Sequence, residues 1–366
     1  MTPAAPWHEL LADAEHESVT VVRRPEAGLH AVIAVHSTVL GPALGGVRLH
    51  PYPTFGDAVA DVLRLSRAMT AKAALAGLDL GGGKAVIHGD PAMKTPALID
   101  AFADAVDALG GRYLTAEDVG TDQQDMDRIR RRTPHVTGTA TTRGGSGDPS
   151  PLTARGVLRA MQAAAEAAWG AGLRDRRVLV LGVGKVGGAL VELLVAEGAE
   201  VLVADVDDGR VRSALGAGAA AAVPADSWVG TPVDVLSPCA LGGDLTAERA
   251  GSLRAGVVVG GANNQLASPE VAELLHAAGV LYVPDFLANA GGIINIAEER
   301  KGYDLDAAAR AVDRIGETTH AVLALAARQG ITPLQAADRL VAERLAGATS
   351  TPRSGAGGSA APARSG

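Results

Sequence analysis

Two lysines and one aspartate in the first half of the chain have types and a spacing suited to acid–base chemistry. Lys84 follows three consecutive glycines, whose bare backbone can approach a ligand closely. Lys72 lies twelve residues earlier, just past an expected amphipathic helix, and provides a second cation. Neighbouring ammonium groups lower each other's pKa, as does burial, and a lysine that is neutral near pH 7 is a competent general base. Asp118, which follows an expected strand, is placed to complete such a site.

The scarcity of lysine favours this interpretation. The chain has 33 lysines and arginines, of which only five are lysines. Two of those five stand in this short segment, Lys72 and Lys84. Taken singly, each of the three residues keeps a plainer alternative, a surface lysine or a loop aspartate.

A glycine pattern in the second half predicts a dinucleotide site. An apolar run over 178–181 leads into a G-x-G-x-x-G motif, which permits a tight turn, a close approach to a pyrophosphate and close packing of helix on strand. Asp205 ends the next expected strand, 23 residues after Gly182. A carboxylate there accepts hydrogen bonds from the ribose hydroxyls and repels a 2′-phosphate, which favours NAD over NADP. No arginine follows Asp205 immediately, and Arg210 is the nearest. The alternative is an ordinary tight turn with a surface acid. The expected cofactor-binding residues of the turn are Gly182, Val183, Gly184, Lys185, Val186, Gly187 and Gly188.

The elements that must position these residues form two groups. The first half mixes β-rich runs within 19–50 with an amphipathic helix over 56–69 and a helix beginning at Thr95 and Pro96. A short strand over 112–115 and a short helix over 125–131 follow. After Arg177, apolar runs alternate with helical stretches, which is typical of a parallel sheet covered on both faces. These runs are 178–181, 201–204, 233–236, 257–259 and 281–283.

We therefore expect an α/β protein of two domains. An α/β substrate-binding and catalytic domain is expected over 1–148, and a Rossmann-type NAD domain over 149–330. A stretch rich in glycine, serine and proline over 143–151 is the candidate hinge. A helix over 331–346 is expected to pack back on the first domain, and the tail over 350–366 is expected to be disordered.

Composition argues against several classes of partner. The net charge of −8, with no basic run of five residues, argues against nucleic acid. The single cysteine, Cys239, allows no internal disulfide and fits a cytoplasmic location. The beginning of the sequence lacks the pattern of a secretory signal, and no apolar stretch is long enough to span a membrane. No metal site is expected.

Several longer motifs resemble the leucine/valine/phenylalanine dehydrogenase branch of the glutamate dehydrogenase superfamily. The resemblance runs from about residue 19 to 346 and implies two domains with the active site in the cleft between them. It also implies NAD as cofactor, an L-amino acid as substrate and a homo-oligomer. It implies that Lys72 binds the substrate carboxylate, with Lys84 as acid–base group and Asp118 exchanging protons with the amine. Val47 departs from the threonine usual in the family, which removes a hydroxyl beside the substrate loop. The matching motifs are 41–48, 69–84, 115–121, 147–154, 238–243, 261–265 and 289–292. The remaining residues that the resemblance assigns are Gly45 and Gly46 at the carboxylate, and Thr153, Ala240 and Asn263 near the nicotinamide.

Four apolar residues suggest which amino acid is bound. Leu44 stands where the glutamate branch has a lysine, and an apolar side chain there would leave the carboxylate of a glutamate substrate unpaired. Ala116, Ile293 and Ile296 resemble the aliphatic-specific pocket. We therefore expect leucine, valine or isoleucine as substrate. Two alternatives stay open, a phenylalanine dehydrogenase and a catalytically silent NAD-binding paralogue.

Overall fold

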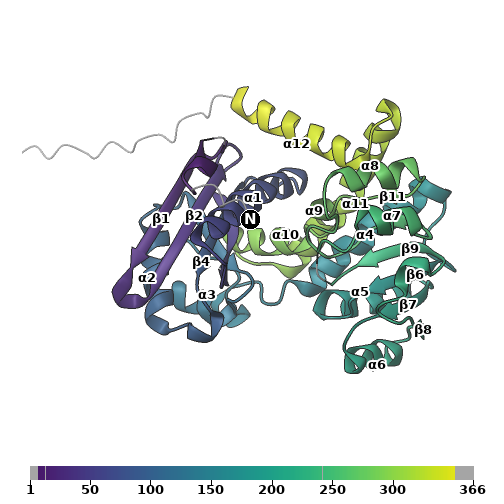
Figure 1. Ribbon diagram of the computed structural model, residues 1–366, viewed down its shortest axis with the longest axis horizontal. Coiled ribbons are helices and arrows are strands. Elements are labelled where there is room, and N and C mark those ends of the chain that lie inside the picture. Colours follow the sequence, from purple (N-terminus) through teal and green to yellow (C-terminus); the bar gives the residue numbers. More distant parts are fainter. Residues whose placement is uncertain (1–6, 13, 241, 351–366) are drawn as a thin grey trace, which may run out of the picture.

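Two separate β-sheets organise the chain, and each forms the centre of one lobe (Figure 1). The computed structural model describes residues 7–12, 14–240 and 242–350. The expectation of a disordered tail therefore falls almost entirely outside the described residues. The α/β architecture with a parallel sheet in the second lobe agrees with the expected fold class.

The first lobe holds a mixed five-stranded sheet in the order β1-β2-β4-β3-β5. The pairs β1–β2 and β2–β4 are antiparallel, whereas β3 runs parallel to both β4 and β5. Helix α1 packs on one face, and α2 buries its apolar side against the other. The elements are β1 (Ser18–Arg24), β2 (Leu29–Ser37), β3 (Ala43–His50), α1 (Phe55–Leu75), β4 (Gly81–His88), α2 (Pro96–Asp107), β5 (Tyr113–Glu117) and α3 (Gln123–Ile129).

Helix α1 is longer than its apolar periodicity predicts, and this changes the place of Lys72. A capping box between Thr54 and Asp57 starts the helix, and Gly77, with φ of 72°, follows its end. Residues 70–75 continue the helix because most of them are good helix formers. Lys72 therefore lies within the last turn of α1 and not beyond the helix, as the sequence had suggested.

The three glycines before Lys84 lie in strand β4 rather than in a ligand-binding turn. Their role is to let other parts of the protein approach. A Cβ on Gly82 would lie 2.1 Å from the backbone nitrogen of Thr70 on α1, and one on Gly83 would lie 2.7 Å from the ring of Tyr113 on β5. The glycines thus allow helix α1 and the Tyr113 ring of β5 to approach β4 closely. The sequence had suggested instead that they make room for a ligand.

The second lobe holds an all-parallel six-stranded sheet in the order β11-β10-β9-β6-β7-β8. Alternate residues of its strands face opposite layers of helices, so apolar side chains are buried on both faces. The elements are α4 (Ser150–Trp169), β6 (Arg177–Leu181), α5 (Lys185–Ala196), β7 (Glu200–Ala204), α6 (Asp208–Gly216), β8 (Ala221–Ala222), β9 (Val233–Pro238), α7 (Ala247–Ser252), β10 (Ala255–Val258), α8 (Glu270–Ala277), β11 (Leu281–Tyr282), α9 (Asp285–Ala288), α10 (Gly291–Glu298), α11 (Leu305–Gln329) and α12 (Pro333–Ser350).

The last helix, α12, reaches the first lobe again. It runs along the top of both lobes in the view of Figure 1. The Arg344 guanidinium on α12 donates to the backbone carbonyls of Ala74 and Leu78 at the end of α1, the latter at 2.8 Å. Among the described residues, no helix is long and apolar enough to cross a bilayer.

Candidate active site

Lys84 and Asp118 form a close ion pair on one face of the first sheet. Lys84 lies on β4 and Asp118 directly follows β5. These two strands flank β3, so the three strands present neighbouring side chains on that face. The Nζ of Lys84 lies 2.8 Å from Oδ2 of Asp118, and the lysine side chain is only 8% exposed. The structure thus brings together the two residues that the sequence proposed as acid–base partners.

Gly45 and Gly46 on β3 make this approach possible. A Cβ on Gly45 would lie 1.7 Å from the carbonyl oxygen of Gly83, and one on Gly46 would lie 2.9 Å from the Cβ of Asp118. Any larger residue at these positions would separate β3 from its neighbours. The hydroxyl of the buried Tyr113 donates to the Gly45 carbonyl at 2.5 Å, which holds the backbone of β3 in place.

A chain of alternating charges extends from the pair. Arg48, on the same face of β3, places Nε 3.1 Å from Oδ2 of Asp118 and Nη1 2.8 Å from Oδ2 of Asp61 on α1. Asp61 also accepts from the Tyr52 hydroxyl at 2.6 Å and pairs with Arg64. Each charge therefore has an opposite partner, which offsets the cost of burying it.

The electrostatics keep Asp118 ionised. Burial alone would raise the pKa of its carboxyl group, but the charges of Lys84 and Arg48 outweigh that effect and lower the pKa below its ordinary value. Asp118 consequently carries its negative charge at neutral pH and accepts hydrogen bonds from cations placed beside it.

Lys72 faces the same region from the end of α1 and contacts the second lobe. Its Nζ donates to Oδ1 of Asn263 at 3.1 Å. Burial, with a smaller contribution from Lys84, lowers the pKa of Lys72 to about 8, although Asp285 and Asp118 act in the opposite direction. The expected mutual depression of the two lysines is therefore present on Lys72, with burial as the larger cause.

Asn263 is held in place by its own lobe. Its Oδ1 also accepts from Nδ2 of the buried Asn289 at 2.8 Å. Two residues further on, the backbone nitrogen of Gln265 donates to Oδ2 of Asp285 at 3.0 Å. Asn263 and Asp285, with Arg48 and Ala240, line a cavity of about 860 Å³ between the lobes. Lys72 of the first lobe thus contacts a loop of the second.

Three of the proposed pocket residues belong to one apolar cluster. Leu44 on β3 is fully buried in it, Ile293 on α10 is 5% exposed, and Ile296 packs against it. Ala116 is buried on β5, where it pairs with Gly46. The cluster spans both lobes, so an apolar environment lies beside the charged residues.

Val47 does not lie beside the substrate loop, contrary to the expectation from its departure from the family pattern. Its side chain is fully buried in the core on the far face of the sheet, together with Leu49 and Ala85. Successive residues of a strand point to opposite faces, so a neighbour of Gly46 and Arg48 faces away from Lys84. An apolar residue suits this position.

The G-x-G-x-x-G motif forms the turn between β6 and α5, with a geometry that needs glycine. Gly182 has φ of 86°, and a Cβ there would lie 2.6 Å from the Cβ of Ala240. A Cβ on Gly187 would lie 1.9 Å from the carbonyl oxygen of Gly182. Gly184 is the N-cap of α5 and has no capping side chain, which leaves the helix N-terminus available to an anion. A dinucleotide therefore fits this turn, with its phosphates at the start of α5.

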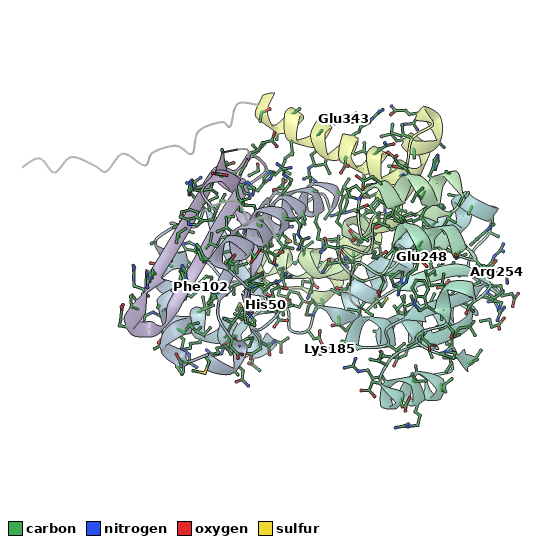
Figure 2. The ribbon with its side chains drawn as sticks, viewed as in Figure 1. His50, Phe102, Lys185, Glu248, Arg254 and Glu343 are labelled. Carbon is green, nitrogen blue, oxygen red and sulfur yellow. The ribbon has the colours of Figure 1, made fainter. Side chains whose placement is uncertain are left out.

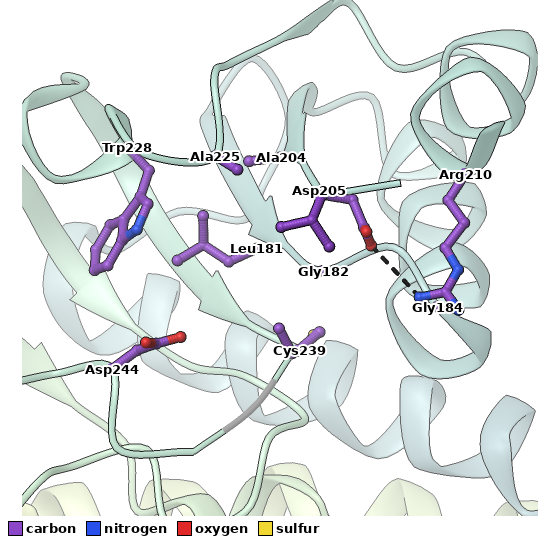
Figure 3. A pocket seen from close by; sticks show the side chains of 12 residues that line it. Leu181, Gly182, Gly184, Ala204, Asp205, Arg210, Ala225, Trp228, Cys239 and Asp244 are labelled. Carbon is purple, nitrogen blue, oxygen red and sulfur yellow. Dashed lines mark ion pairs between the residues drawn. The ribbon is translucent and has the colours of Figure 1, made fainter. Parts of the chain in front are cut away.

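A cavity of about 510 Å³ continues from the turn, lined by Gly182, Asp205, Arg210 and Trp228 (Figure 3). Asp205 follows β7, and its Oδ2 accepts from the backbone nitrogen of Val183 at 2.8 Å. The acid predicted for ribose recognition thus stands beside the turn, as its spacing required. Among the described residues, no group of three His, Cys, Asp or Glu side chains could hold a metal ion.

The other proposed cofactor residues surround the turn and the cleft. Figure 2 labels Lys185 on the side of the second lobe that faces the first, and its Nζ lies 3.4 Å from Oδ2 of Asp148 in the connecting segment. Thr153, in the first turn of α4, donates to the carbonyl of Pro149 at 3.0 Å. Val186 and Gly188 lie in the first turn of α5, where Val186 packs close to Gly261.

Sequence reasoning missed the partners that orient these groups. Arg48 was visible as the last residue of the 41–48 motif, but its link to Asp61 joins a strand to a helix and has no local signal. Asn289 similarly belongs to the matching motif 289–292, but nothing in the sequence indicated that its side chain donates to Asn263. Arg210 was noted only as the nearest arginine after Asp205.

Comparisons with known proteins agree with this arrangement. Residues 16–135 match the family model described as Glu/Leu/Phe/Val dehydrogenase, dimerisation domain, and residues 208–351 match Glutamate/Leucine/Phenylalanine/Valine dehydrogenase. A valine dehydrogenase of Streptomyces virginiae is 48% identical over 91% of this chain and 94% of its own length. A leucine dehydrogenase of Bacillus cereus is 44% identical over 92% of this chain and 93% of its own length.

A solved structure is similar over the whole fold. The crystal structure of L-tryptophan dehydrogenase from Nostoc punctiforme has a TM-score of 0.82 and 36% identity. The similarity covers 94% of this chain and all of that one.

Proposed function

Because the chain belongs to the Glu/Leu/Phe/Val dehydrogenase family, we propose that it oxidatively deaminates a branched-chain L-amino acid, leucine, valine or isoleucine. In the proposed reaction the amino acid, NAD⁺ and water give a 2-oxo acid, ammonium, NADH and a proton, reversibly. The observation that carries the proposal is the buried Lys84–Asp118 pair, 2.8 Å apart, whose neighbour Arg48 lines the cavity between the lobes.

The first lobe binds the reacting end of the substrate. The Lys72 ammonium pairs with the α-carboxylate, assisted by the backbone at Gly45 and Gly46. The ionised Asp118 accepts hydrogen bonds from the α-ammonium group and takes up one of its protons. These contacts hold the Cα–H bond in a fixed orientation, which is the main requirement for hydride transfer.

The second lobe holds the dinucleotide, with its phosphates at the Gly182–Gly187 turn and its nicotinamide near Thr153, Ala240 and Asn263. When bound, NAD⁺ supplies the hydride acceptor. Closure of the lobes excludes water from this step and strengthens the interactions inside the cleft.

Lys84 performs the second half of the reaction. Loss of hydride leaves an iminium ion on the substrate, and Lys84, in the deprotonated form that this step requires, removes a proton from the water that attacks its carbon. The resulting ammonium form of Lys84 stabilises the developing oxygen. Asp118, 2.8 Å away, returns its proton to the nitrogen, which leaves as ammonia. As the carbonyl forms, Asp118 takes the proton of the hydroxyl group and passes it to the ammonia to give ammonium, and the proton on Lys84 is released to solvent.

The apolar cluster supports the choice of an aliphatic substrate. Fully buried Leu44 offers no partner to a side-chain carboxylate, which disfavours glutamate. Ile293 and Ile296 are bulky and limit the volume that a substrate side chain could occupy beside Leu44. The relatives named as valine and leucine dehydrogenases are more similar in sequence than the tryptophan dehydrogenase, in accord with this preference.

We also expect a homo-oligomer in the cytoplasm. The family model that matches residues 16–135 is described as a dimerisation domain. The single cysteine fits a reducing compartment.

NADH formation from NAD⁺ with a panel of L-amino acids tests the proposal. Valine, leucine and isoleucine are expected to be turned over, with overlap among them because one methylene discriminates by only about 1–3 kcal/mol. Glutamate is expected to be inactive and phenylalanine to be poorer. Turnover of none of them would indicate a silent NAD-binding paralogue, and a clear preference for phenylalanine would overturn the pocket argument.

A further inference from the structure

Asp61, on helix α1, is a largely buried carboxylate to which the proposed reaction gives no role. Its side chain is 13% exposed. Its Oδ2 lies 2.8 Å from Nη1 of Arg48 and accepts from the Tyr52 hydroxyl at 2.6 Å, and its Oδ1 lies 2.6 Å from Nη2 of Arg64. Burial would raise the pKa of Asp61, but the Tyr52 hydroxyl and the two arginines outweigh it and lower the pKa below its ordinary value. Asp61 is therefore charged at neutral pH.

Arg48 is shared between Asp61 and the aspartate of the acid–base pair. Its Nε lies 3.1 Å from Oδ2 of Asp118, and the Nζ of Lys84 lies 2.8 Å from that same oxygen. Asp118 thus has two cations on one oxygen, whereas Arg48 has an anion on each side. The charge of Arg48 consequently acts on Asp118 only in part, because Asp61 offsets it.

The proposed proton transfer depends on this balance. Asp118 must be ionised to accept hydrogen bonds from the α-ammonium group, and it must also be basic enough to take one of its protons. Two unopposed cations would stabilise the ionised form further and make Asp118 a weaker proton acceptor. An opposing charge on Asp61 limits that effect, while Arg48 keeps the hydrogen bond that orients Asp118.

Asp61 also joins two elements of the site. It lies on α1 about three turns before Lys72, and it binds Arg48 of β3. A purely structural role for this link would appear in the binding of the substrate carboxylate by Lys72. An electrostatic role would appear instead in the pH dependence of turnover, so the two roles are separable by measurement.

We propose that Asp61 is a positioning residue of the acid–base site, which holds Arg48 and offsets its charge so that Asp118 stays basic enough to take a proton from the substrate amine. Asp61 acts through Arg48 and forms none of the proposed substrate contacts. The inference rests on the proposed function, because it concerns the proton transfer of that reaction. The other groups that interact electrostatically with Asp118 are Lys72 at the end of α1 and Tyr113 and Glu117 on β5.

The pH dependence of turnover of a branched-chain amino acid tests the proposal in Asp61→Asn. The amide keeps the shape of the side chain and an acceptor for Arg48, but it removes the charge. Loss of a negative charge lowers the pKa of any ionisable group beside it, so the acidic limb of the kcat/KM profile is expected to move down by about 0.5–1 pH unit. The plateau of kcat is expected to fall about three- to tenfold, because Asp118 beside an unopposed Arg48 is a weaker proton acceptor.

Two further variants separate charge from structure. Asp61→Glu keeps the charge, so its acidic limb is expected to stay within about 0.2 pH unit of that of the unaltered chain. Arg64→Gln, a substitution at a side chain that is 53% exposed, removes a cation that competes for Asp61. Its acidic limb is expected to move in the opposite direction, up by about 0.2–0.5 pH unit, which tests the link even if Asp61→Asn does not fold.

Asp100→Asn is the matched control. Asp100 on α2 forms a comparable pair with Arg128 on α3, at 2.7 and 2.5 Å, and α2 packs on the other face of the sheet. This variant is expected to leave both kcat and the acidic limb unchanged. NADH titration and thermal denaturation check that every variant keeps its cofactor site and its fold.

The outcomes are distinct. An unmoved acidic limb in Asp61→Asn, with a change confined to the KM of the amino acid, would contradict the proposal and leave Asp61 a structural role. An equal shift in Asp61→Glu or Asp100→Asn, or an unmoved or lowered limb in Arg64→Gln, would also contradict it. Absence of turnover in the unaltered chain would instead overturn the proposed function, and this inference with it.

Discussion

The two lobes contribute to the site by different means. The first lobe supplies charged side chains on one face of a sheet, where Asp118 lies 2.8 Å from Lys84 and 3.1 Å from Arg48. The second lobe supplies mainly backbone, a turn whose shape depends on Gly182 and Gly187. The first half is therefore sensitive to loss of charge, and the second half to added volume.

Because the second lobe is expected to be sensitive to added volume, adding one methyl group to a glycine of its turn tests this difference directly. Gly182→Ala forces an alanine into φ of 86°, with its Cβ 2.6 Å from Ala240. The left-handed conformation alone costs about 1–2 kcal/mol, and relief of the clash must move the turn. We expect NADH binding to weaken about a hundredfold, corresponding to about 2.7 kcal/mol.

Gly216→Ala is the matched control for that variant. A Cβ on Gly216 would meet no atom within 4 Å, and the residue ends helix α6 of the same lobe. NADH titration of both variants measures the effect. Equal loss of affinity in the two would mean that the turn is not shaped by its glycines.

A change of pH tests the first lobe with a smaller effect. The pKa of Lys72 is lowered to about 8, so the side chain is charged below that pH and loses its proton as the pH rises through it. The inhibition constant of an aliphatic monocarboxylate such as 3-methylbutanoate is therefore expected to rise about tenfold per pH unit above about 8.

The Lys72→Arg variant sharpens this experiment. Arginine stays protonated throughout this range, so the inhibition constant is expected to remain flat with pH even if it is higher overall. An unchanged pH dependence in the variant would assign the titration to another group and would remove Lys72 as the carboxylate ligand.

The contrast between the lobes also explains what could be predicted from the sequence. The turn at Gly182 and the acid at Asp205 have a local pattern, since strand, glycines and helix follow one another directly. The parallel sheet was similarly evident from its apolar runs. The Arg48–Asp61 link and the Lys72–Asn263 contact join residues far apart in the chain, so no spacing reveals them.

The glycines before Lys84 illustrate a different difficulty. A glycine-rich segment is compatible with a ligand-binding turn and with close packing of the protein on itself. Only the proximity of Thr70 and Tyr113 distinguishes the two. The end of α1 was misplaced for a related reason, because Lys72 interrupts the apolar stripe without interrupting the helix.

The central claim is that Lys84 is the acid–base group of the reaction. The most direct test measures turnover of a branched-chain amino acid and NADH binding in the Lys84→Ala variant, with Lys94→Ala as control. Lys94 pairs with Asp125 on α3 and with Asp122, the N-cap of that helix, in a separate ion-pair cluster from that of Lys84. We predict that Lys84→Ala loses turnover by about a hundred- to ten-thousandfold, the usual contribution of a general base, while NADH still binds and Lys94→Ala stays active. Near-normal turnover in Lys84→Ala would contradict the account.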